Sequence, residues 1–324
     1  MSEISRRKFV TNSTMVLAAG AVAPLFAQTS HPRSPFKLAV ISDEISQDFD
    51  YACSVIAKEF NLQWVELRGM WGKNLQNLSD AEIAKAQAIL RKYDLQVTDI
   101  GSPLFKVDWP DAPRSNFSPK KDSFSADFTF RQQQDVLEHS IALAKQFKTN
   151  RVRCFDFWRL EDVKPHRAAI NAKLLEAANL CGKQSIVLVL ENEFECNTAT
   201  GREAVATLAA VSSPHLMLNW DAGNAVRAGE LDAFPVAWKL LPKDRIGHVH
   251  CKNAVKDAEG KIVWAPVGTG YIDWVEQFKD LAAVGYRHAV SLETHWRGAG
   301  TPEASTRVSW QQMKEALRKS NTLG

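Results

Sequence analysis

Short apolar runs alternate with longer amphipathic stretches through most of the chain, and this alternation constrains the fold more than any other feature. The runs occupy residues 38–42, 64–68, 97–101, 152–155, 186–191, 216–220, 246–250 and 289–293. Apolar residues at three- and four-residue spacing predict helices over residues 81–93, 132–147, 168–181, 234–241, 274–284 and 303–319. Strict alternation predicts parallel strands with helices packed outside them, and eight strands close a single-domain α/β fold, the (β/α)8 TIM barrel, over residues 37–324. An open doubly wound sheet is the alternative, but no GxGxxG motif follows an early strand.

The N-terminal segment has the pattern of an export signal. Arg6 and Arg7 form a twin-arginine pair, and an uncharged run rich in Ala and Val continues to Ala27. This pattern predicts a twin-arginine signal peptide over residues 1–27, followed by a linker over residues 28–36. The run is too short and too polar for a stable membrane span, and no later segment reaches that length, so a retained anchor is the less favoured alternative. We therefore expect a periplasmic or otherwise exported protein, whose partner is the twin-arginine machinery that carries folded proteins.

The composition argues against nucleic-acid binding and against a disulfide framework. The chain has 40 Lys and Arg against 37 Asp and Glu, a formal net charge of +3. Removal of residues 1–27 takes away three basic residues and one acid, which leaves the chain almost neutral and without a polyanion-binding surplus. The five cysteines are scattered and include no CxxC pair, so we interpret them as buried thiols.

One connection is unusually long, from residue 103 to residue 127. Loops of this length are usually either functional or disordered. Because this loop leaves the third strand at its carboxyl end, we interpret it as a flap over the mouth of the barrel. A mobile surface excursion is the alternative.

Polar side chains follow four of the predicted strands. The fifth strand ends in Glu191, the sixth in Asp221 and the eighth in Glu293, while the seventh carries His248 and His250 on one face. Each residue alone has an ordinary interpretation, since a strand-end carboxylate is often a helix cap and a histidine is often a core residue. Together they form three carboxylates and an imidazole that would repel and desolvate one another unless a cation binds between them. This set predicts a divalent metal, with Mn, Mg or Co favoured by the oxygen-rich ligands and Zn tolerated.

Six pieces of sequence, in a fixed order, carry a resemblance to a known superfamily. They are residues 65–68 (VELR), 190–192 (LEN), 221–224 (DAGN), 248–253 (HVHCKN), 266–270 (PVGTG) and 292–293 (LE). In these pieces the chain resembles the xylose isomerase-like barrel superfamily of sugar isomerases and epimerases, which includes tagatose 3-epimerase, hydroxypyruvate isomerase and inositol-catabolism relatives. The resemblance covers roughly residues 37–310, which is nearly all of the chain after the signal.

The resemblance implies roles for individual residues. The metal ligands fall on Glu191, Asp221, His250 and Glu293, and the two glutamates are also implied as the catalytic acid/base pair, one on each face of the sugar. Two departures concern the substrate side: Asn224 stands where a histidine is frequent, and Asn253 stands where an aspartate is common. These departures bear on the reaction more than on the metal.

Further residues are expected around the substrate. Arginine, lysine and histidine side chains would contact hydroxyls or a carboxylate, and tryptophans near strand ends (Trp71, Trp158, Trp220, Trp264, Trp296) offer flat faces to a sugar ring. The absence of a Gly-rich phosphate cradle favours an unphosphorylated small-molecule carbohydrate. The expected substrate-binding residues are Glu66, Arg68, Arg153, Trp158, Asn224, His248, Lys252 and His295.

The expected reaction passes through an enediolate. A metal-chelated carbonyl lowers the cost of removing the neighbouring proton, and a carboxylate acts as general base. Return of the proton by a second carboxylate makes the protein an isomerase or epimerase, whereas loss of a leaving group makes it a lyase acting on 3-keto-glycosides. A non-catalytic sugar-binding barrel and an endonuclease IV-type phosphodiesterase are further alternatives. The phosphodiesterase requires more metal-binding histidines on early strands than this sequence has.

Overall fold

The eight apolar runs form eight parallel strands, as their alternation with helices predicts. The computed structural model describes residues 33–118 and 128–324. The strands are β1 Lys37–Val40, β2 Trp64–Leu67, β5 Gln96–Leu104, β6 Arg151–Cys154, β7 Val187–Glu191, β8 Leu216–Asp221, β9 Ile246–Cys251 and β12 Ala289–Leu292. They pair in the order β1-β12-β9-β8-β7-β6-β5-β2. A parallel bridge between Ile41 and Glu66 joins the two ends of this series, which completes the barrel.

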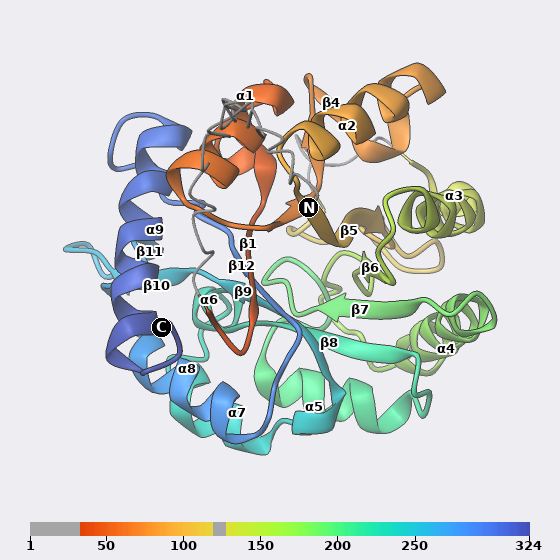
Figure 1. The fold of residues 1–324 in the computed structure, drawn as a ribbon. Coiled ribbons are helices and arrows are strands. Elements are labelled where there is room, and N and C mark those ends of the chain that lie inside the picture. The colour runs from red at the N-terminus through yellow and green to blue at the C-terminus, as the bar shows by residue number, and fades with distance from the viewer. Residues whose placement is uncertain (1–32, 119–127) are drawn as a thin grey trace, which may run out of the picture. The chain divides into compact units, whose positions relative to one another are not determined.

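Helices cover the outside of the strands (Figure 1). They are α1 Phe49–Ser54, α2 Asp80–Lys92, α3 Gln133–Gln146, α4 Arg167–Lys183, α5 Gly201–Ala210, α6 Ala222–Arg227, α7 Trp238–Leu240, α8 Trp274–Ala283 and α9 Pro302–Lys319. Local sequence fixes several of their starts: Ser79 and Thr200 form capping boxes with the glutamates three residues later, and Asp273 caps α8. The fold is therefore the single-domain (β/α)8 barrel that the sequence predicts. None of the helices in the described part of the chain is long and apolar enough to cross a membrane.

Two short antiparallel pairs extend the loops at the carboxyl ends of the barrel strands. The pair β3 Gly69–Met70 and β4 Lys73–Asn74 follows β2, and the pair β10 Asn253–Lys256 and β11 Ile262–Ala265 follows β9. Neither pair is predicted from the sequence. In this architecture functional sites lie at the carboxyl ends of the strands, so both pairs border the expected site.

The helix predicted over residues 234–241 is correct only in part. A π-helical turn covers Ala233–Ala237, with Phe234 in an extended conformation, and α7 is a single turn. Pro235 lies inside this pattern, and it lacks the backbone N–H that a regular helix needs. The apolar spacing here therefore marks a buried segment and not a continuous helix.

The long connection after β5 packs along the loop that follows β6. The Trp158 amide donates to the carbonyl of Val107, and Trp109 packs edge-on against Phe157 with ring centroids 4.8 Å apart. Trp109 is buried as a result. The described part thus has a fixed place beside the mouth of the barrel, whereas residues 119–127, the remainder of the predicted flap, lie outside the described residues.

Side-chain alternation along the strands decides what faces the barrel interior. All five cysteines are buried and unpaired, as predicted. Trp220 is fully buried and donates from Nε1 to Gln277 on α8, so its side chain packs towards the helices. The expectation that Trp220 contacts a sugar is therefore wrong. Its neighbours Asn219 and Asp221 face inwards, because successive residues of a strand point to opposite faces.

Candidate metal centre

The four predicted metal ligands converge at the carboxyl end of the barrel. Nδ1 of His250 lies 3.2 Å from Oε1 of Glu191, 3.3 Å from Oε2 of Glu293 and 3.6 Å from Oδ2 of Asp221. One ligand atom from each of the four lies within 4.8 Å of the others, and all four residues are buried. The residues come from four neighbouring strands, β7, β8, β9 and the end of β12, so the barrel itself sets their spacing.

Local structure around Asp221 orients its carboxylate so that Oδ2 faces the other ligands. It is the last residue of β8 and the N-cap of α6, where Oδ1 accepts a hydrogen bond from the Asn224 amide at 2.7 Å. The backbone of Asp221 is also held by Asn192, which donates to its carbonyl at 2.7 Å and accepts from its amide at 2.8 Å. Oδ2 is left facing the centre.

Basic side chains surround the carboxylates. Nη1 of Arg153 lies 3.1 Å from Oε2 of Glu191, and Nη1 of Arg68 lies 2.8 Å from Oε1 of Glu293. Nζ of Lys252 lies 2.9 Å from Asp221 and 2.5 Å from Glu293. Each glutamate thus has a cationic neighbour of its own, and the two glutamates lie in different surroundings.

These contacts shift the protonation equilibria of the buried groups. Burial alone would raise the pKa of Glu191, but the charges of His250 and Arg153 outweigh it and lower the pKa to about 2. Burial likewise opposes ionisation of Glu293, yet Lys252, His295 and His250 hold its pKa well below the usual value. For His250, burial would lower the pKa, but Glu66, Glu191 and Glu293 raise it well above the usual value. Basic groups and carboxylates at the centre therefore stabilise one another's charged forms.

This arrangement fits a divalent cation. Oε2 of Glu191 and Oδ2 of Asp221 are buried, and no described residue donates a hydrogen bond to either, although basic groups lie close to both. Buried carboxylate oxygens that lack hydrogen bonds are costly unless a cation compensates them. Three carboxylates and one imidazole form an oxygen-rich set that suits several divalent metals. Among the described residues, two other groups also have metal-binding spacing: Glu66 with His248 and His250, and Glu44 with Glu293 and His295.

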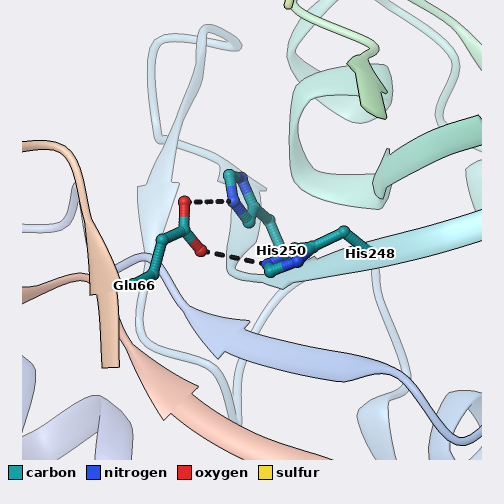
Figure 2. Close-up of side chains that lie close together, drawn as sticks. All are labelled: Glu66, His248 and His250. Carbon is teal, nitrogen blue, oxygen red and sulfur yellow. Dashed lines mark hydrogen bonds and ion pairs between the residues drawn. The ribbon is translucent and has the colours of Figure 1, made fainter. Parts of the chain in front are cut away.

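The predicted substrate-binding residues fall into three positions. Five lie directly beside the four ligands: Arg68, Arg153, Asn224, Lys252 and His295. Two more, Glu66 and His248, lie deeper in the barrel. There the carboxylate of Glu66 contacts both His248 and the ligand His250 (Figure 2). Trp158 belongs to a small separate cluster with Phe155 and Cys196. The substrate contacts themselves stay predictions.

Several residues of the site are not predicted from the sequence. Asp43 and Glu44 follow β1 and accept from Arg68 at 3.1 and 2.7 Å. Both stand just beyond the predicted first strand, so they fit the same pattern as Glu191, a carboxylate at the end of a predicted strand. Asp99, inside β5, is fully buried, and neither of its oxygens has a hydrogen-bond partner among the described residues. Burial, reinforced by the charge of Glu66, raises its pKa well above the usual value.

An aromatic wall formed by Phe194 and Trp264 borders the centre. Trp264 belongs to β11, and its ring centroid lies 5.4 Å from His295 and 6.0 Å from Phe194. Nζ of Lys252 lies 4.8 Å from the centre of the Trp264 ring. The wall is half-buried, so it can offer apolar faces to a ligand held beside the carboxylates.

Comparison with known proteins identifies the family. The model of the xylose isomerase-like TIM barrel family matches residues 55–319, so the chain belongs to this family. No curated protein matches the chain.

Solved structures share the fold at low sequence identity. A probable 3-DHS dehydratase, AsbF of Bacillus anthracis, has a TM-score of 0.61 and 20% identity, covering 86% of this chain and 98% of that chain. The D-psicose 3-epimerase of Clostridium cellulolyticum H10, solved with D-tagatose, has a TM-score of 0.62 and 18% identity over 88% and 98%. The IOLI protein with a bound zinc atom has a TM-score of 0.64 and 14% identity over 88% and 98%. At these identities the likeness establishes the fold alone.

Proposed function

We propose that this chain is a divalent-metal-dependent sugar isomerase or epimerase that acts through an enediolate on an unphosphorylated sugar or keto-sugar. The observation that carries the proposal is the position of Glu191 and Glu293. Their carboxylates both lie close to Nδ1 of His250, at 3.2 and 3.3 Å, and each has its own basic partner. Two carboxylates at one centre can serve proton removal and proton return.

Each carboxylate can serve a different step. A divalent cation held by Glu191, Asp221, His250 and Glu293 would supply Lewis acidity and so would lower the cost of forming the enediolate. One glutamate takes the proton from the carbon next to the carbonyl, and the other returns a proton to the neighbouring carbon or to the opposite face. Arg153 and Asn224 position Glu191, while Arg68, Lys252 and His295 position Glu293. Proton return to the adjacent carbon gives an isomerase, and return to the opposite face gives an epimerase.

The surroundings of the centre support a carbohydrate ligand. The aromatic wall offers apolar ring faces beside the centre, and arginine, lysine and histidine side chains there offer hydrogen-bond donors. D-tagatose bound to the psicose epimerase is the sugar present in a structure of the same fold. These features favour a small sugar over a macromolecular substrate.

Export is part of the proposal. The Arg6–Arg7 pair and the uncharged run that follows support transport through the twin-arginine route. An exported enzyme meets free sugars more often than sugar phosphates, which is why we propose an unphosphorylated substrate.

One experiment separates the candidate reactions. Metal-loaded protein is incubated with panels of ketoses and 3-keto-glycosides in deuterated water, and products are identified by NMR. Deuterium incorporation with a rearranged sugar is the expected result. Release of an aglycone would establish the lyase instead, and absence of both exchange and product would indicate a sugar-binding barrel.

A further inference from the structure

Glu66 lies beneath the metal centre and contacts two histidines at once. It belongs to β2 and is fully buried. Oε1 lies 3.1 Å from Nε2 of His250, and Oε2 lies 3.0 Å from Nε2 of His248, as Figure 2 shows. Both oxygens of one carboxylate are therefore directed at imidazole nitrogens.

A carboxylate can accept hydrogen bonds but, when ionised, has none to donate. Each histidine must consequently present a protonated Nε2 to Glu66. A histidine that ligates a metal is neutral, and in a neutral imidazole only one nitrogen carries the proton, so Nδ1 of His250 is left with a free lone pair. That nitrogen is the one that faces Glu191, Asp221 and Glu293.

The second oxygen of Glu66 keeps the carboxylate in place. His248 and His250 lie two residues apart on one face of β9. Their rings are at 90° to each other with centroids 5.4 Å apart, so they approach Glu66 from two directions. Nε2 of His248 also lies 3.0 Å from Oγ of Ser291 on β12. A carboxylate held at both oxygens cannot rotate away from His250.

Asn219 makes the opposite demand on the same nitrogen. Its Nδ2 lies 3.1 Å from Nε2 of His250, and an amide nitrogen donates, which would require an unprotonated Nε2. A charged acceptor binds a donor more strongly than a neutral group does, so Glu66 decides the tautomer. Oδ1 of Asn219 is buried without a hydrogen-bond partner among the described residues, and a half-turn of the amide would direct it at the Nε2 proton.

From this geometry we infer that Glu66 is a positioning residue, which fixes His250 in the Nε2–H tautomer and thereby directs Nδ1 at the metal. The role differs from the substrate contact expected of Glu66 from the sequence. It rests on the proposed metal centre. Outer carboxylates that orient a ligating imidazole contribute about 10- to 100-fold to metal affinity in other metal sites.

Metal binding and tautomer state test the inference without any substrate. Zinc affinity is measured for the full chain by competition with a chromogenic chelator, in the wild type, Glu66→Gln, Ser291→Ala and Asn219→Ala. Glu66→Gln keeps the shape but leaves one oxygen for two histidines, so its zinc Kd should rise about 10- to 100-fold. Ser291→Ala, which removes a contact of His248 only, should change the Kd far less.

Long-range 1H–15N correlation spectra of the zinc-loaded wild type, labelled at histidine, give a second readout that needs no variant. His250, assigned by comparison with His250→Gln, should show a protonated Nε2 and a metal-bound Nδ1. An unchanged Kd in Glu66→Gln, a larger loss in Asn219→Ala, or metal on Nε2 would each overturn the role of Glu66. Failure of the wild type to bind zinc or manganese would instead overturn the proposed metal centre, which distinguishes the two.

Discussion

Nζ of Lys252 lies 2.5 Å from Oε2 of Glu293, the same oxygen that faces Nδ1 of His250. The ammonium also lies 2.9 Å from Oδ2 of Asp221, so it contacts two of the four proposed ligands. Its side chain is 1% exposed, and burial opposes its charge, yet Asp221 and Glu293 raise its pKa above the usual value. Lys252 therefore places a positive charge beside carboxylates that would also bind the metal.

Replacement of Lys252 should lower the stability of the metal-free protein and raise its affinity for the metal. Lys252→Met leaves buried carboxylates without their partner, so the metal-free protein should lose about 3–5 kcal/mol in its free energy of unfolding. The same change removes a positive charge that competes with the metal, so affinity should rise at least about tenfold, or 1.4 kcal/mol. Urea unfolding with chelator and a metal titration measure the two quantities. Lys106→Met, whose ammonium faces Glu193 at 3.6 Å, is the control. Metal affinity that falls in Lys252→Met would contradict the competition.

Glu191 and Glu293 should be separable from each other by isotope exchange. Glu191→Gln and Glu293→Gln each keep an oxygen near the centre but cannot accept a proton, so turnover at saturating metal should fall about 10²-fold or more. Substrate affinity should stay within about tenfold. Solvent exchange of the substrate proton should vanish in the variant that lacks the base and can persist in the variant that lacks only the acid.

The control for this pair is Glu193→Gln, two residues beyond Glu191 and directed at Lys106. It should retain turnover. Wild-type turnover in both Glu191→Gln and Glu293→Gln would refute the paired-carboxylate mechanism and direct attention to His248 or Lys252 as the proton carrier.

His288 should give the free energy of unfolding a dependence on pH, because its pKa is lowered in the folded protein. It precedes β12, and Nη2 of Arg151 lies 2.8 Å from its Nδ1. Burial, followed by the charges of Arg151 and Lys37, lowers the pKa of His288 to about 4. In the unfolded chain the pKa is about 6.5, so below that pH the unfolded state binds a proton that the native state does not. The free energy of unfolding should therefore fall as the pH decreases from about 6.5 towards 4.

The variant His288→Gln removes this contribution. Unfolding is measured from pH 8 to pH 4.5 for both proteins, and the difference isolates His288 because other groups titrate alike. The difference should be constant above about pH 7 and move in favour of the variant below about pH 6. Parallel curves over the whole range would show that the pKa of His288 is the same in the folded and unfolded protein.

Export can be tested at Arg6 and Arg7. A twin-arginine signal depends on the pair itself, so Arg6→Lys with Arg7→Lys should keep the protein in the cytoplasm, while the wild type is exported with a new N-terminus near Gln28. Cell fractionation with N-terminal sequencing measures both. Unchanged export of the double variant would rule out this route.

The strands and most helices follow from local sequence, and the misses have physical causes. Alternation of apolar and amphipathic segments places all eight strands and helices such as Gln133–Gln146 within a few residues. Pro235 interrupts the pattern near residues 234–241, and the β10–β11 pair depends on contacts between segments that local periodicity does not report.

The candidate site was predictable where a ligand ends a strand. Glu191, Asp221 and Glu293 are of this kind. Asp99 was not predictable, because it lies within a strand. Its raised pKa depends on burial in the closed barrel and on the nearby charge of Glu66. Trp220 stands at a strand end too, but strand alternation turns it outwards, so position along the chain alone was insufficient.

The central claim is that one divalent metal binds between Glu191, Asp221, His250 and Glu293. Anomalous diffraction from crystals grown with Mn²⁺ or Zn²⁺ tests it most directly. We expect a single strong peak within about 2.5 Å of one atom from each of these residues, including Nδ1 of His250, and its loss in His250→Ala. A peak between Glu44, Glu293 and His295, or between Glu66 and the two histidines, would contradict this assignment, as would a wild-type crystal without any peak in the barrel.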